Sequence, residues 1–125
     1  MPKIDLKELA NFLTRQPDVV FAVVFGSAQN GVVAATSDLD LGILFDPPRP
    51  TEPLLDLMSQ MADLTGVEAL DYTDMARANP ILAFEAISGR FLCKNSREKT
   101  AVYCARICRE YEQIMFRFGR TADGR

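Results

Sequence analysis

An apolar run that ends at a Gly-Ser pair, and is followed by two closely spaced aspartates, constrains this chain more than any other feature. Residues 19–25 read VVFAVVF, and Gly26 and Ser27 follow them directly. A second apolar run opens with Asp38 and Asp40. Runs of this length that are rich in Val and Phe and bounded by Gly or Ser predict β-strands. We therefore expect two strands, with the aspartates at the start of the second.

The two aspartates predict a cation site. Side chains alternate across a strand, so Asp38 and Asp40 point to the same face, about 6.6 Å apart along the backbone. Two carboxylates on one face repel unless a cation lies between them, and Mg²⁺ prefers oxygen ligands. Gly26 allows a phosphate to approach the backbone closely, and Ser27 offers a hydroxyl and N–H groups to an anion. A metal seat beside a phosphate-binding turn is what nucleotidyl transfer requires.

The motif resembles that of a known family. Ten residues separate Gly26-Ser27 from Asp38, and one residue separates Asp38 from Asp40. This spacing resembles the G-S-x10-D-x-D signature of the DNA polymerase β-type nucleotidyltransferase superfamily. The small size resembles its minimal nucleotidyltransferase (MNT) branch, whose members are commonly antitoxins paired with HEPN-domain ribonuclease toxins. The resemblance covers about residues 19 to 93.

The resemblance implies an enzyme that moves AMP from ATP to a hydroxyl on a partner protein, a tyrosine of a HEPN toxin. Two Mg²⁺ ions would be held by Asp38, Asp40 and a third carboxylate. Gly26 and Ser27 would bind the phosphates of ATP, and Ser37 would orient the carboxylates or cap the connection.

The third carboxylate is expected on a strand over residues 67–73, VEALDYT. The family pattern places Glu68 at the third acidic position and Asp71 at a secondary one. These two side chains lie on opposite faces of a regular strand, so both cannot point into one site. We favour Glu68 as a metal ligand and as the group that accepts the proton of the incoming hydroxyl, with Asp71 as the alternative.

Two other functions compete with protein adenylylation. Asn30 stands before Gly31 where many superfamily members have an arginine, which removes a positive charge near the phosphates. This departure, and Glu68 at a position where the family more often has Asp, motivate a nucleotide-binding or partner-binding module that neutralises its partner by contact alone. The third hypothesis is a small-molecule nucleotidyltransferase of the aminoglycoside-modifying kind.

The remaining patterns predict one α/β (α+β) domain over residues 1–120, with a disordered tail over 121–125. We expect a small mixed sheet with helices on one face, the carboxylates on the open face, and a polymerase β-like nucleotidyltransferase fold. Hydrophobic periodicity and capping residues predict helices over 5–16, 51–66, 80–89 and 96–119, the last being long, and a short edge strand over 90–94.

Composition limits the partners. A net charge of −3 argues against broad nucleic-acid binding, which needs a basic face. The chain has no histidine, so it lacks the Arg…His motif of HEPN ribonucleases and cannot be the toxin of such a pair. No apolar run approaches the roughly 18 residues of a membrane span, and no signal peptide is visible. We expect a cytoplasmic protein whose three cysteines are reduced thiols.

The predicted C-terminal helix carries an apolar stripe over about four turns. Arginines make much of its remaining surface basic. Most of such a stripe is usually core, and a contact with a second copy or with a toxin is the alternative for the rest.

Overall fold

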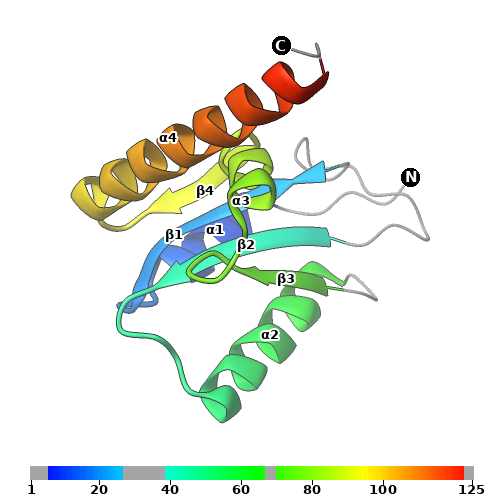
Figure 1. The fold of residues 1–125 in the computed structure, drawn as a ribbon. Coiled ribbons are helices and arrows are strands. Elements are labelled where there is room, and N and C mark those ends of the chain that lie inside the picture. Colours follow the sequence, from blue (N-terminus) through cyan, green and yellow to red (C-terminus); the bar gives the residue numbers. More distant parts are fainter. Residues whose placement is uncertain (1–5, 27–38, 67–69, 123–125) are drawn as a thin grey trace.

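The fold is described from a computed structural model, which describes residues 6–26, 39–66 and 70–122. Within these ranges the fold is α+β, with four helices and a four-stranded sheet (Figure 1). The elements in order are α1 (Leu6–Thr14), β1 (Val19–Phe25), β2 (Leu39–Phe45), α2 (Thr51–Thr65), β3 (Leu70–Asp74), α3 (Pro80–Ile87), β4 (Arg90–Lys94) and α4 (Arg97–Ala122).

The sheet is mixed, and its strand order is β3-β2-β1-β4. β1 pairs antiparallel with both β2 and β4, whereas β2 and β3 are parallel. Parallel neighbours need a crossover connection, and α2 supplies it between β2 and β3. The sheet therefore has β4 at one edge, as predicted, and β3 at the other.

Helices cover both faces of the sheet, which corrects the prediction of helices on one face. α1 and α2 share a core with Leu39 and Leu41 of β2, whereas α3 and α4 share a second core with Phe21 and Val23 of β1. All seven residues of β1 are buried. An uninterrupted apolar strand is typical of burial on both faces, so the VVFAVVF run already contained this information.

Local signals place the helix ends close to their predicted positions. Gly66 ends α2 in the left-handed conformation, with φ of 69°. Asn79 caps α3 by accepting a hydrogen bond of 2.9 Å from the Leu82 amide. Ser96 caps α4 in the same way, through the Lys99 amide at 3.2 Å.

The C-terminal helix is longer than predicted. α4 continues through Ala122, three residues past the predicted end at 119, and residues 123–125 lie outside the described part. Over the three described ranges, none of the helices combines the length and apolarity that a membrane crossing requires. The three cysteines are free thiols, as expected, and burial raises the pKa of Cys93 to about 11.

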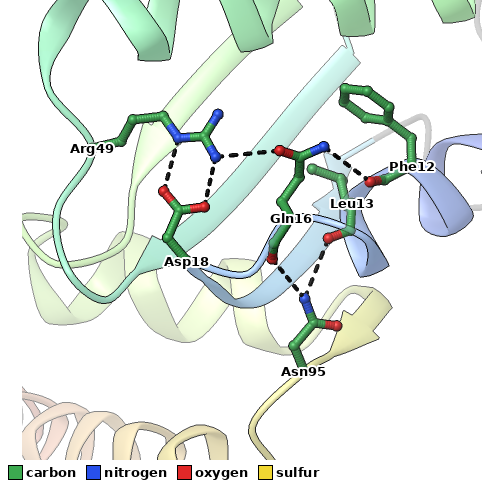
Figure 2. Close-up of polar contacts among 6 residues, drawn as sticks. All are labelled: Phe12, Leu13, Gln16, Asp18, Arg49 and Asn95. Carbon is green, nitrogen blue, oxygen red and sulfur yellow. Dashed lines mark hydrogen bonds and ion pairs between the residues drawn. The ribbon is translucent and has the colours of Figure 1, made fainter.

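A polar network ties together three segments at the end of the sheet where β1 begins (Figure 2). Arg49, in the loop after β2, donates to both carboxylate oxygens of Asp18 at 2.6 and 2.8 Å. The same guanidinium donates to the Gln16 side chain at 3.3 Å. Asn95, just after β4, donates to the backbone oxygens of Leu13 and Gln16, each at 3.3 Å. The network joins the end of α1 to the loops that follow β2 and β4.

The Asp18–Arg49 pair predicts a dependence of stability on pH. The hydrogen bonds from Arg49 lower the pKa of Asp18 below the ordinary value of an aspartate. The ionised pair therefore stabilises the fold above that value, and this contribution is lost as pH falls through the lower pKa of the folded state. Asp18→Asn should reduce the free energy of unfolding by about 1 to 2 kcal/mol at pH 7. Denaturant titrations should show this difference narrowing toward pH 3, whereas an undiminished difference there would contradict the assignment.

Candidate functional site

The end of β1 and the start of β2 bring a glycine against a carboxylate. Phe25, the last residue of β1, pairs with Asp40 of β2. Gly26 follows with φ of 70°, in the left-handed region that favours glycine. A Cβ atom built on Gly26 would lie 2.5 Å from Oδ2 of Asp40. The backbone conformation therefore favours glycine, and a side chain at this position would also force the Asp40 carboxylate to move.

The next strand brings a second carboxylate beside the first. In the parallel pairing of β2 with β3, Asp40 lies in register with Asp71. Residues in register on neighbouring strands project to the same face, about 4.8 Å apart along the hydrogen-bonding direction. On the other face, Leu39 and Leu70 point into the core formed with α1 and α2. The sheet therefore sets Asp40 and Asp71 side by side on the face that carries α3 and α4.

This part of the face is open. Asp71 is exposed and Asp40 is partly exposed. Two residues further along β2, the same face is covered by Met75, whose sulfur would lie 2.7 Å from a Cβ atom built on Gly42. The carboxylates thus lie at the margin of the second core, where a ligand can reach them from solvent.

The charges at this site suit a hard cation. Two neighbouring carboxylates on an open face repel each other unless a cation lies between them, and oxygen ligands of this kind suit Mg²⁺. Over the described ranges, no three acidic or cysteine side chains gather in an arrangement that could hold a metal ion. Asp38, Ser27, Ser37 and Glu68 lie outside the described residues, so the site is seen through Gly26, Asp40 and Asp71.

The residue that pairs with Asp40 is Asp71, which the sequence offered only as the alternative to Glu68 for the third carboxylate. The register of two strands joined by a helix cannot be predicted from the sequence of either strand alone. The family pattern could also be aligned with VEALDYT in more than one way. A usable signal was the position of the strand's apolar residues. Leu70 and Tyr72 flank Asp71 and pack on the core, which leaves Asp71 facing the other side.

A large hollow lies away from the carboxylates. It has a volume of about 610 Å³ and is lined by residues that include Val20, Leu44 and Tyr103. Val20 is near the start of β1 and Leu44 near the end of β2. None of the candidate site residues lines this hollow, so it takes no part in the assignment of the site.

Comparison with known proteins identifies the fold. The family model for polymerase beta, nucleotidyltransferase, matches residues 7–98. This range contains every candidate site residue named above. None of the curated proteins matches the chain.

Solved structures with the same fold cover nearly the whole chain. A chain from the crystal structure of a toxin–antitoxin with AMP-PNP has a TM-score of 0.72 and 16% identity, covering 97% of this chain and 98% of that chain. A chain of the toxin–antitoxin MntA–HepT has a TM-score of 0.65 and 14% identity, with 95% of each chain covered. The same values describe a chain from the complex of the tri-AMPylated Shewanella oneidensis HEPN toxin with its MNT antitoxin. At these identities the likeness shows a shared fold.

The contact between Gly26 and Asp40 predicts a difference between two glycines. Gly66 has φ of 69°, almost the same as Gly26, but a Cβ atom built there meets nothing within 4 Å. Alanine at either position pays the same backbone strain, of about 1 kcal/mol. Gly26→Ala should therefore reduce the free energy of unfolding more than Gly66→Ala, because its Cβ also collides with the carboxylate. The excess should disappear when Asp40 is replaced by Ala, and its persistence in that double variant would contradict the geometry.

Proposed function

Because the chain belongs to the polymerase beta nucleotidyltransferase family, we propose that it moves AMP from ATP to a hydroxyl on a partner protein. The observation that carries the proposal is the position of Asp40, between the left-handed Gly26 and the in-register Asp71 at an open margin of the sheet. This arrangement offers a close backbone approach for phosphate beside paired carboxylates for a cation.

Asp40, Asp71 and Asp38 would hold the metal. The open face and the repulsion between the neighbouring carboxylates fit a divalent cation with oxygen ligands. When bound, a pair of Mg²⁺ ions would neutralise the charge of the triphosphate and of the departing pyrophosphate. The chain's own contribution is to orient the carboxylates on a rigid sheet and to leave the space beside them open to both substrates.

We assign the third carboxylate to Asp71 in place of Glu68. The support is the register, which sets Asp71 directly beside Asp40 on the same face. A carboxylate in that position serves as a ligand and as the acceptor of the proton from the incoming hydroxyl. Glu68 lies outside the described residues and serves as the comparison in the experiment below.

Gly26 and Ser27 would bind the phosphates of ATP. A residue without a side chain at Gly26 lets a phosphate oxygen approach the backbone amides. The Ser27 hydroxyl would add a donor, and Ser37 would orient the neighbouring carboxylates. The solved structure with AMP-PNP shares this fold, which supports ATP as the nucleotide.

The proposed acceptor is a tyrosine on a HEPN-domain toxin, which makes this chain the antitoxin. Support comes from the shared fold with an MNT antitoxin whose complex contains a tri-AMPylated HEPN toxin. The toxin would dock over the open margin of the sheet, where the exposed Asp71 lies. A second candidate function is neutralisation by contact alone, which is favoured by Asn30 at the place where many superfamily members carry arginine.

Label transfer distinguishes these functions. The chain is incubated with ATP labelled at the α-phosphorus, Mg²⁺ and a candidate HEPN-domain partner protein. Transferase activity puts label on that protein, and Asp40→Asn or Asp71→Asn should each reduce the rate by at least about 100-fold. Glu68→Gln should have a much smaller effect. The control is Asp56→Asn on the exposed side of α2, which should leave the rate unchanged.

Three other results would overturn parts of the proposal. A toxin that is inhibited but unlabelled would identify the binding module. Label on an added aminoglycoside rather than on the protein would identify a small-molecule nucleotidyltransferase. A rate abolished by Glu68→Gln but retained by Asp71→Asn would return the third carboxylate to Glu68.

A further inference from the structure

α4 carries a regular stripe of exposed residues, the first two of which, Glu98 and Val102, also line the hollow that α4 forms with β1 and β2. The helical rotation of about 100° per residue puts Glu98, Val102, Ala105, Arg109, Glu112 and Phe116 within about 40° of one line, and all six are exposed. We call these residues the outer stripe. The buried residues Thr100, Tyr103 and Ile107 lie on the opposite side of the helix. α4 lies along one margin of the molecule with the body on its other side (Figure 1).

The spacing of the outer stripe is that of a helix-pairing seam. Its members alternate by four and three residues, the heptad pattern by which two helices pack side by side. From Glu98 to Phe116 the stripe is about 27 Å long at 1.5 Å per residue. Val102 and Phe116 are 67% and 64% exposed. Large apolar side chains with this exposure and this spacing are typical of a surface that another helix covers.

The stripe is complementary to itself when one copy is reversed. If a two-fold axis crosses the helix at the level between residues 110 and 111, Arg109 faces Glu112 of the partner subunit, and the reverse pair forms by symmetry. The small Ala105 then faces the large Phe116 of the partner subunit. At these four positions, 105, 109, 112 and 116, both the charges and the sizes of the side chains match. A parallel arrangement in the same register would place each charge against its own copy.

The charged pair at the centre is available for this contact. Over the described ranges, no ion pair within the chain holds Arg109 or Glu112. Arg109, Glu112 and Phe116 also line a surface hollow of about 570 Å³ together with Gln113 and Arg117. A hollow beside the seam gives the side chains of an opposing helix a place to interdigitate.

We propose that two copies of this chain associate as an antiparallel pair through the outer stripe of α4, held in register by reciprocal Arg109–Glu112 contacts. The apolar members of the stripe supply the burial, and the charges set the direction and the register of the pair. This face is separate from the carboxylates, so the association does not depend on the proposed transferase activity.

Sedimentation equilibrium of the full chain, up to several hundred micromolar, tests the proposal. The wild-type chain should be a dimer. Arg109→Glu sets like charges against each other in both contacts and should weaken association at least about tenfold. Arg109→Glu combined with Glu112→Arg exchanges the charges and should restore the wild-type constant to within about threefold. Phe116→Ala should weaken the dimer without affecting this rescue.

The matched control is Arg97→Glu, which makes the same change of charge on the first turn of α4, away from the stripe. It should leave the dimerisation constant unchanged, and far-UV circular dichroism should show equal helix content in all variants. A wild-type chain that stays monomeric at every concentration would overturn the proposal. A double variant that dimerises no more tightly than Arg109→Glu alone would also overturn it. The same holds if substitutions in the outer stripe leave the dimerisation constant unchanged and weaken only the binding of a HEPN-domain protein.

Discussion

The structure depends on the complete burial of β1. All seven of its residues are buried, and the strand pairs on both sides, with β2 and with β4. A strand of this kind needs a layer of helices on each face, because apolar side chains that alternate between the two faces must all be removed from water. α1 and α2 supply one layer, and α3 and α4 supply the other. The order of the remaining elements follows from covering this one strand.

The candidate site follows from the point where this burial stops. β1 ends at Phe25, and the chain turns at Gly26 with a left-handed φ. Past that point the face toward α3 and α4 is no longer filled, and Asp40 and Asp71 occupy it instead of apolar side chains. Charged groups remain here at low cost because water still reaches them. The catalytic chemistry proposed for the chain is thus located at the margin between a dry core and solvent.

The sequence predicted local elements well and long-range relations less well. β1 and β4 match their predicted ranges, and α2, α3 and α4 begin within one residue of the starts that short-range patterns predicted. The register between β2 and β3 is set by the length and packing of α2, which separates them in the chain, so the neighbour of Asp40 could not be read from either strand. The second layer of helices was not predicted, although the unbroken apolar run of β1 is typical of a strand buried on both faces. The predictions for Asp38, Ser27, Ser37 and Glu68 lie outside the described residues and stay predictions.

The polar network around Arg49 has a consequence for how proteins of this fold diversify. Asp18, Gln16 and Asn95 fasten three chain segments at the end of the sheet where β1 begins (Figure 2). Gly26 and Asp40 belong to the end where β1 finishes. Because the fastening and the chemistry occupy opposite ends of the same strands, mutation can remodel the acidic residues without loosening the scaffold. A single substitution among the acidic residues can therefore abolish the proposed chemistry while this polar network, and the fold that it holds together, stay in place.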